Sequence, residues 1–302
     1  MVKRSLAITS AAHLSIKNRQ VVLSQDKKVL NSAPLEDLAI IVVDSSDSTW
    51  SSCLLAECGN HGIAVVFCGE KHLPTAILLP QVGHHLMAHI QRQQLQTKLP
   101  TKKRLWQTII TAKIIAQSKT LQRYGKDDSD LRILLTKIKS GDTTNMEGVA
   151  AARYFSRLFG DDFIRDPELL GINSRLNYGY AILRAAVARS IVLSGLDVSL
   201  GIWHHNRFNA FALADDLIEP LRPAVDQLVV DSLTTLPVAE HSELNPAVKR
   251  HLLQILTTEV GWADHGQPLS NFPLDVALQR FCSQVREALT HGGTEVHCPQ
   301  VL

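Results

Sequence analysis

The spacing of apolar residues changes near Pro80, and this change constrains the fold more than any other feature. Before it, apolar residues form short runs rich in β-branched side chains, as strands do. We expect a tight hairpin turn at Asn18–Arg19 and one helix over Trp50–Cys58, capped by Ser48 or Thr49. Short strands at close spacing predict a small β-sheet domain. The predicted strands cover residues 6–9, 14–17, 21–23, 39–43 and 64–68.

After Pro80, apolar residues recur with the period of an α-helix. Leu105, Ile109, Ala112 and Ile115–Ala116 illustrate the apolar face of a packed helix. We expect an α+β protein in which a small N-terminal β-sheet domain, residues 1–82, is followed by a linker, 83–100, and a larger all-helical C-terminal domain, 101–302. The predicted helices cover residues 103–124, 131–140, 146–158, 178–194, 209–219, 246–259 and 274–289.

The overall composition excludes several classes of protein. The 302 residues carry 31 basic and 29 acidic side chains, so any contact with nucleic acid must come from local patches rather than bulk charge. Five cysteines form an odd, scattered set, typical of reduced thiols. The first residues lack the apolar run of a secretion signal, and no stretch approaches the ~20 apolar residues of a membrane span. We therefore expect a soluble cytoplasmic protein with no membrane partner.

One motif combines histidine and acidic residues. His204 and His205 precede a probable helix on which Asp216 and Glu219 lie three residues apart, so their side chains share a face. Pro220 should end or kink that helix. A solvated acidic face and a structural histidine are one interpretation, and a metal site is the other. Carboxylates with one imidazole suit Mg²⁺ or Mn²⁺ better than structural zinc.

A second motif surrounds Glu147. Asn145 or Thr144 should cap a helix, and Glu147 then falls in its first turn, where the helix dipole favours an acid. This structural role is sufficient by itself. Gly148 and the alanines that follow it also indicate space around Glu147 for another helix or a ligand.

A third motif is a probable helix that Asn177 caps and that Gly195 ends in a left-handed conformation. Arg184 and Arg189 lie on its otherwise apolar surface. We expect at least one of these arginines to pair with a buried acid.

Taken together, these motifs resemble the CRISPR-associated integrases that acquire new spacers, specifically the branch from type II systems. The resemblance covers essentially the whole chain, and the residues from Phe67 to Leu79 resemble the end of that branch's β domain. It is carried mainly by four segments: NMEGVAAARYF at Asn145–Phe155, LNYGYAILR at Leu176–Arg184, GLDVSLGIWH at Gly195–His204 and DLIEPLRPAVD at Asp216–Asp226.

The resemblance implies a catalytic, metal-binding set made of Glu147, His204 and Glu219, with Asp216 and Asn177 in support. His204 fits the family's frame of a glycine three residues before the histidine, whereas a shift of one residue would make His205 the ligand. Contact with DNA is expected from basic residues, although a solvated surface is the alternative for each. These basic residues are Lys102, Lys103, Arg104, Lys137, Lys139 and Arg222.

The resemblance also implies the reaction and the partners. A DNA 3′-hydroxyl attacks a phosphodiester of a repeat array, with Mg²⁺ or Mn²⁺ in the site. The implied partners are a short DNA duplex, the repeat array, a second copy of this chain, a small companion protein that bridges two dimers, and the effector nuclease of the same system. The alternatives are a metal-dependent nuclease that cuts branched DNA without joining it, and a DNA-binding scaffold without enzymatic activity. His297 and Cys298 near the C-terminus are a weak metal-binding signal.

Overall fold

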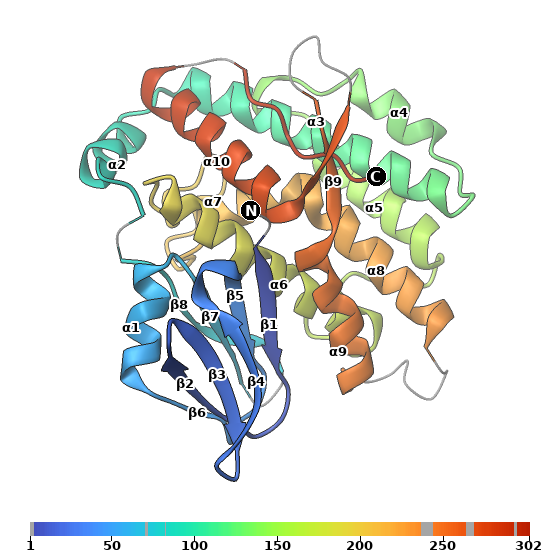
Figure 1. The fold of residues 1–302 in the computed structure, drawn as a ribbon. Helices are drawn as coiled ribbons and strands as arrows, with labels where there is room; N and C mark the ends of the chain where they lie inside the picture. The colour runs from blue at the N-terminus through green and yellow to red at the C-terminus, as the bar shows by residue number, and fades with distance from the viewer. Residues whose placement is uncertain (1–2, 70–71, 82, 237–243, 264–268, 293–294) are drawn as a thin grey trace.

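The computed structural model describes residues 3–69, 72–81, 83–236, 244–263, 269–292 and 295–302. Strands make up the N-terminal part and helices most of the remainder (Figure 1), which confirms the α+β class. The helical part also contains an antiparallel pair, β9 (Glu259–Trp262) and β10 (Ser270–Pro273). This pair was not expected, because strands of four residues are too short to show a clear alternation.

Two four-stranded sheets form the N-terminal part, in the orders β1-β5-β7-β8 and β4-β3-β2-β6. Strands β1, β5 and β7 are parallel, and β8 closes the first sheet as an antiparallel edge. The elements are β1 (Arg4–Ile8), β2 (His13–Lys17), β3 (Gln20–Gln25), β4 (Lys28–Pro34), β5 (Leu38–Val43), β6 (Thr49–Trp50), α1 (Ser52–Asn60), β7 (Ala64–Cys68) and β8 (Pro74–Leu78).

The predicted hairpin is confirmed, whereas the predicted cap of α1 is wrong. Asn18 and Arg19 both have positive φ, 51° and 58°, as the turn of a two-residue hairpin requires. The cap of α1 is Ser51, whose side chain accepts a hydrogen bond from the Leu54 amide at 3.3 Å. Thr49 is not available to cap the helix because it pairs with β2 as part of β6.

Strand β5 joins the sheet domain to the helices, because all six of its residues are buried. Ile40 and Val42 belong to the large core shared with the helices, while Ile41 and Val43 belong to the core between the two sheets and α1. Successive side chains of a strand point to opposite faces, so an uninterrupted apolar run fits a strand that is covered on both sides.

Each of the seven predicted helical segments contains a helix, but α8 was not expected as a helix. α2 lies within the predicted linker, 83–100, and the domain limits themselves stay predictions. The helices are α2 (Met87–Leu95), α3 (Leu99–Arg123), α4 (Ser129–Leu135), α5 (Met146–Phe159), α6 (Ile172–Leu193), α7 (Ala212–Ile218), α8 (Arg222–Thr235), α9 (Pro246–Leu252) and α10 (Leu274–His291).

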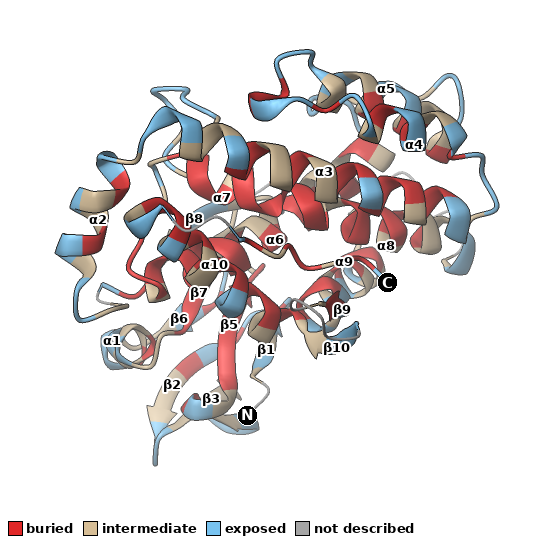
Figure 2. Cartoon of the chain, turned by 90° about the horizontal axis from the view of Figure 1, so that it is seen from above, coloured by how far each residue is buried: buried red, intermediate tan, exposed pale blue. Residues whose placement is uncertain are grey.

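Helices α3 and α6 form the centre of the helical part, where the buried positions gather (Figure 2). The buried face of α3 differs from the predicted one. Ile115 is 38% exposed, whereas Ile110 and Ile114 are fully buried. Lys113 is also buried on this face, so its charge must be compensated by the side chains packed around it.

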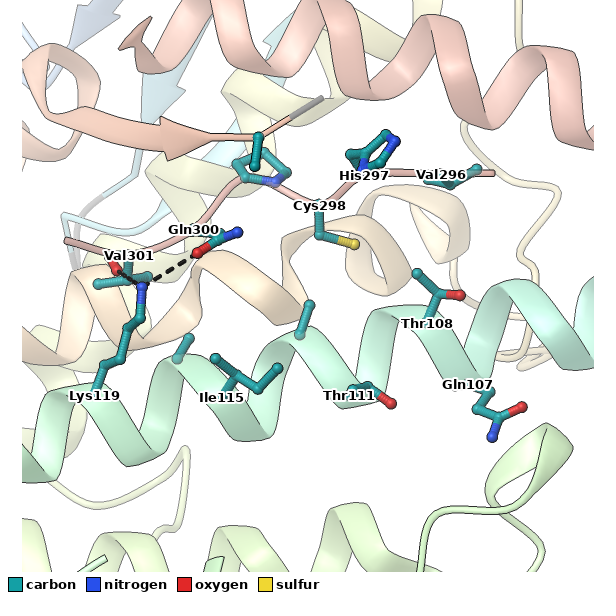
Figure 3. Close-up of a pocket in the computed structure, with 14 residues that line it drawn as sticks. Gln107, Thr108, Thr111, Ile115, Lys119, Val296, His297, Cys298, Gln300 and Val301 are labelled. Carbon is teal, nitrogen blue, oxygen red and sulfur yellow. Dashed lines mark hydrogen bonds between the residues drawn. The ribbon is translucent and has the colours of Figure 1, made fainter. Parts of the chain in front are cut away.

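The opposite face of α3 borders a groove of about 450 Å³ beneath the C-terminal segment (Figure 3). Thr111, Ile115 and Lys119 line it, and helical spacing places them on the side of α3 away from Lys113. Burial raises the pKa of Cys298 to about 12, which keeps this thiol protonated in the metal-free protein. Among the described residues, no group of three histidine, cysteine or acidic side chains could hold a metal ion here, so the groove does not support the weak metal-binding signal at His297 and Cys298.

In the part of the chain that the structure describes, no helix combines the length and apolar character needed to cross a membrane. All five cysteines lie in described segments and are free thiols, in agreement with the prediction from their odd number and scattered spacing.

Candidate active site

Glu147 lies in the first turn of α5, as predicted, and its backbone is held on two sides. Asn145 caps the helix by accepting a hydrogen bond from the Gly148 amide at 3.3 Å. Asp142, which was not expected to contribute, accepts hydrogen bonds from the amides of Met146 and Glu147 at 2.8 and 2.9 Å. Any Cβ at position 148 would lie 2.8 Å from the Asn145 amide nitrogen. The glycine therefore makes room for the cap rather than for a ligand.

Glu219 lies where α7 changes into α8. α7 ends at Ile218, and Pro220 sits in the short 3-10 turn that follows, which confirms that this proline ends the helix. Glu219 is only 3% exposed. A carboxylate buried to this extent must be compensated by cations or hydrogen-bond donors.

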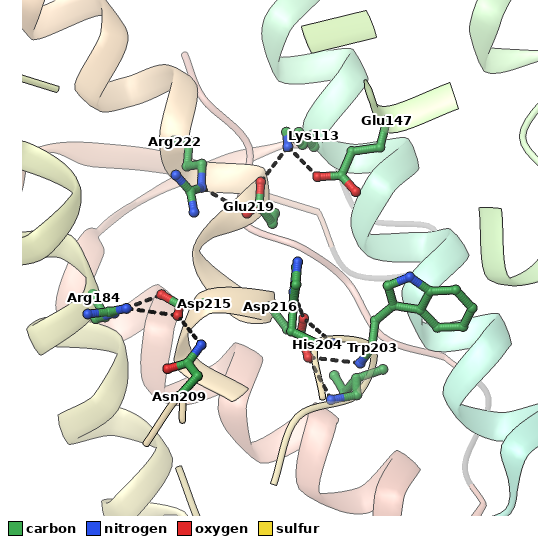
Figure 4. A network of polar contacts seen from close by, with 11 residues as sticks. Lys113, Glu147, Arg184, Trp203, His204, Asn209, Asp215, Asp216, Glu219 and Arg222 are labelled. Carbon is green, nitrogen blue, oxygen red and sulfur yellow. Dashed lines mark hydrogen bonds and ion pairs between the residues drawn. The ribbon is translucent and has the colours of Figure 1, made fainter. Parts of the chain in front are cut away.

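Lys113 of α3 lies between Glu147 and Glu219, as Figure 4 shows. Its Nζ is 2.7 Å from Oε1 of Glu147 and 2.5 Å from Oε2 of Glu219. Burial by itself would lower the pKa of Lys113, but the Glu219 and Glu147 carboxylates outweigh burial and raise it. Our sequence reasoning missed this residue. The available signal was a lysine on the same helical face as Ile109 and Ile110.

Arg222 is the second cation beside Glu219. Its Nε is 2.8 Å from Oε1 of Glu219, and its guanidinium lies 4.7 Å from the centre of the Tyr180 ring. Burial alone would raise the pKa of Glu219, but Arg222 and Lys113 together lower it below its ordinary value. The arginine proposed to contact DNA is thus already engaged by a carboxylate of the site.

Asp216 has different partners from Glu219, although the two residues lie three positions apart. Its buried carboxylate accepts hydrogen bonds from the amides of Ile202, Trp203 and His204 at 2.6, 2.9 and 3.3 Å. Oδ1 also lies 2.5 Å from Nδ1 of the His204 ring. This contact raises the pKa of His204 despite the opposing effect of burial. Asp216 therefore positions the histidine and its loop.

The structure distinguishes the two neighbouring histidines. The His204 ring is held by Asp216 and stands edge-on to the Trp106 ring, with centroids 5.5 Å apart. Because Nδ1 is engaged, Nε2 is the ring nitrogen that can bind a metal or carry a proton. Both histidines are exposed and line the adjoining groove, so the contact with Asp216 is what distinguishes them. This arrangement supports His204 as the functional histidine.

A polar groove of about 320 Å³ adjoins His204. Lys102 and Arg207 line it, so one of the lysines expected to contact DNA lies beside the predicted active site. Lys103 is half-buried, while Arg104 is exposed. Lys137 and Lys139 are exposed as well.

Several other predicted residues lie elsewhere. Asn177 does not cap α6, because this helix already begins at Ile172. The Asn177 side chain instead accepts a hydrogen bond from Arg165 and donates one to the Pro167 carbonyl, both at 2.7 Å. Asn209, the first residue of the helix predicted over 209–219, lies before α7.

The helix-end prediction is confirmed, whereas the acids that pair with the two arginines are partly exposed rather than buried. Gly195 has φ of +88° at the end of α6. Arg184 pairs with Asp215 at 2.7 Å, and Arg189 with Asp275 at 2.6 Å. These pairs explain both arginines as parts of the packed structure.

The chemistry of the donors fits a divalent cation, but they do not form a ready-made metal cluster. Within the described segments, no group of three histidine, cysteine or acidic side chains is close enough to hold a metal ion. Glu147 and Glu219 nevertheless converge on one positively charged atom, Nζ of Lys113. Oε2 of Glu219 is buried and receives no hydrogen bond with good geometry from any described residue. Two carboxylates and one imidazole are donors that suit Mg²⁺ or Mn²⁺.

An α+β protein with two converging carboxylates, a histidine held by an aspartate, and nearby basic side chains has the composition of a site that processes phosphodiesters. The family model described as "CRISPR associated protein Cas1" matches residues 6–242. The CRISPR-associated endonuclease Cas1 of Neisseria meningitidis serogroup C (strain 8013) is 38% identical over 266 residues, which cover 86% of this chain and 85% of that protein. The chain belongs to the Cas1 family, and the resemblance seen in the sequence is confirmed at this level.

Solved structures show the same fold at low sequence identity. A casposase bound to integration product matches with a TM-score of 0.77 at 18% identity, over 97% of this chain and 92% of that chain. A chain of a Cas6-RT-Cas1–Cas2 complex matches with a TM-score of 0.73 at 17% identity, over 97% of this chain and 35% of that chain. At these identities, the likeness establishes the fold.

Proposed function

We propose that this chain is a metal-dependent DNA integrase that inserts short foreign DNA fragments into a CRISPR repeat array. The observation that carries the proposal is the convergence of Glu147 and Glu219 on one cationic position, with His204 held nearby. Membership of the Cas1 family supports it, as does the structural likeness to a casposase bound to integration product.

The reaction is a transesterification. The 3′-hydroxyl oxygen of the fragment forms a bond to a phosphorus atom of the repeat, while the bond from that phosphorus to the repeat's own 3′-oxygen breaks. The attacking hydroxyl loses a proton and the leaving oxygen gains one. The number of phosphodiester bonds does not change, so the protein need not supply a covalent nucleophile.

In this proposal Glu147, Glu219 and Nε2 of His204 would hold Mg²⁺ or Mn²⁺. When bound, the divalent ion would supply charge neutralisation at the reacting phosphodiester. Asp216 keeps Nδ1 of His204 occupied and so presents Nε2 to the site. Lys102, in the groove beside His204, offers a positive charge to the DNA backbone.

The proposed partners follow from the family and its structural relatives. A casposase structure holds an integration product and a Cas1-containing chain occurs in a complex with Cas2, which supports DNA and a small companion protein as partners. We further propose that this chain forms a homodimer, that the companion bridges two dimers, that the effector nuclease of the same system joins the complex, and that the complex works in the cytoplasm.

A second candidate is a metal-dependent nuclease that cuts branched DNA and uses water in place of the 3′-hydroxyl. The name of the Neisseria relative, an endonuclease, favours this reading. The same carboxylates would serve both reactions, so the nucleophile must decide between them.

The test uses the purified chain, the companion protein encoded in the same locus, Mg²⁺ or Mn²⁺, a repeat-bearing plasmid and a labelled duplex. We expect joined products that disappear when the duplex ends in 3′-deoxynucleotides. Glu147→Gln and Glu219→Gln should lower the joining rate by at least ~100-fold, whereas Lys119→Met should not change it. Cleavage without joined product would favour the nuclease, and unchanged joining by both glutamine variants would refute the assigned site.

A further inference from the structure

Lys113 is not explained by the proposed chemistry, although it lies at the centre of the site. It comes from the buried face of α3, among Ile109, Ile110 and Ile114, and is only 7% exposed. An ammonium group in such surroundings is unfavourable unless carboxylates compensate its charge. Two carboxylates from other elements do so, and both belong to the proposed metal-binding set.

Lys113 contacts both of these carboxylates directly. Nζ donates a hydrogen bond to Glu147. Nζ also lies 2.5 Å from Oε2 of Glu219, in an ion pair with a carboxylate that is almost completely buried. Each carboxylate thus already has a cationic partner at the position where a metal ion would bind.

Among the two glutamates and the two cations that contact them, the formal charges balance while no metal is bound. Glu147 and Glu219 contribute two negative charges, and Lys113 and Arg222 contribute two positive charges. A divalent ion placed between the carboxylates would meet the Lys113 ammonium at contact distance, where like charges repel strongly in a partly buried site. The flexible four-carbon stem of lysine allows its ammonium to withdraw. The Glu147 side chain, which is 24% exposed, is the more accessible of the two carboxylates.

We propose that Lys113 is a built-in competitor of the metal ion. Its ammonium holds Glu147 and Glu219 together in the metal-free protein and leaves the position between them when a divalent cation binds. This inference rests on the proposed metal site at the two glutamates. Lys113 thereby stabilises the empty site and lowers its apparent affinity for the metal.

The expected magnitude follows from a two-state argument. If the lysine has withdrawn in only about 10% of metal-free molecules, the apparent metal affinity is lowered about tenfold. Lys113→Met removes the charge and keeps a side chain of similar reach. This variant should therefore bind Mn²⁺ about tenfold more tightly than the wild type, and its metal-free form should melt at a lower temperature.

The experiment is calorimetric titration of MnCl₂ into the chelator-treated full chain, with thermal melting in the presence and absence of Mn²⁺. Lys119→Met is the matched control, because Lys119 lies on the opposite face of α3 near Gln300. It should match the wild type in Mn²⁺ affinity. The rise in melting temperature on adding Mn²⁺ should be larger for Lys113→Met than for the wild type or Lys119→Met.

The possible outcomes separate this inference from the proposed function. Equal or weaker Mn²⁺ binding by Lys113→Met, with binding still lost in Glu147→Gln, would overturn the competitor role and leave the metal site standing. Undiminished binding by Glu147→Gln would overturn the metal site itself.

If Lys113→Met does not fold, the wild type can be tested directly by NMR of ¹³Cε-labelled lysine during a Mg²⁺ titration, with Lys113→Arg used to assign the signal. The Lys113 signal should shift while that of Lys119 stays. An unmoved Lys113 signal at saturating Mg²⁺ would overturn the proposal.

Discussion

The two halves of the candidate site solve the problem of a buried carboxylate in different ways. Asp216 is surrounded by three backbone amides and the His204 ring, so its contacts fix the path of a loop. Glu219, three residues further on, faces the side-chain cations of Lys113 and Arg222. Backbone donors cannot leave without unfolding the loop, whereas a side-chain cation can be exchanged for another cation. Asp216, the His204 ring and the backbone amides that contact Asp216 therefore form a position-fixing half of the site. Glu147 and Glu219 with Lys113 and Arg222 form a charge-exchange half.

The largest expected effect comes from removing the position-fixing carboxylate. Asp216→Ala leaves three amides and the His204 ring without their buried acceptor, so we expect the free energy of unfolding to fall by about 3–5 kcal/mol. Chemical denaturation would measure it. His204→Ala is the control and should cost far less, because the His204 side chain is 44% exposed. A loss below about 1 kcal/mol for Asp216→Ala would remove the distinction between the halves.

A smaller effect should appear in double-mutant cycles within the charge-exchange half. Lys113→Met combined with Glu219→Gln should show a coupling energy of about 1–3 kcal/mol in the presence of a chelator. The cycle with Glu147→Gln should give a smaller value, because the Glu147 side chain is 24% exposed and that of Glu219 only 4%. Denaturant titrations of the two cycles provide the comparison, and a larger coupling at Glu147 would contradict it.

DNA binding should separate Lys102 from Arg222. Lys102→Met should weaken binding to duplex DNA and reduce the slope of log affinity against log salt by ~0.9, as expected for one lost phosphate contact. Arg222→Met should leave that slope unchanged, because Arg222 is engaged by Glu219. Fluorescence anisotropy at several salt concentrations would measure both. A reduced slope for Arg222→Met alone would restore it as the DNA contact.

The smallest effect is an opposite pH dependence of the two halves in the metal-free protein. The pKa of His204 is raised from 6.5, chiefly by Asp216, so this contribution to stability is complete below pH 6.5 and is lost as the pH rises through the folded pKa. The pKa of Glu219 is lowered from 4.5 because Arg222 and Lys113 outweigh burial. Its contribution is present above pH 4.5 and is lost as the pH falls through the folded pKa.

An NMR titration of the His204 ring tests the first part of this prediction. The ring should titrate above pH 6.5 in the wild type, and its pKa should fall in Asp216→Asn, which removes the anionic partner. A His204 pKa at or below 6.5 in the wild type would show that the position-fixing half lacks this electrostatic component.

Local patterns determined much of this protein from the sequence alone. The hairpin at Asn18–Arg19, the cap at Asn145, the helix end at Gly195 and the break at Pro220 each depend on the conformational preference of a few adjacent residues. The run of β5 and the main helices follow from apolar periodicity, and the family follows from short motifs. Such features require no knowledge of what lies across the molecule.

The tertiary structure decided which charged side chains meet. Lys113, Glu147 and Glu219 come from three separate elements, and their contacts depend on how α3, α5 and the turn before α8 pack together. Sequence spacing placed Asp216 and Glu219 on one helical face but did not show that one turns to the His204 loop and the other to two cations. Electrostatic partners are chosen by distance in space, and a linear pattern records only distance along the chain. For that reason the sequence indicated the residues of the site, whereas the lysine at its centre emerged only from the fold.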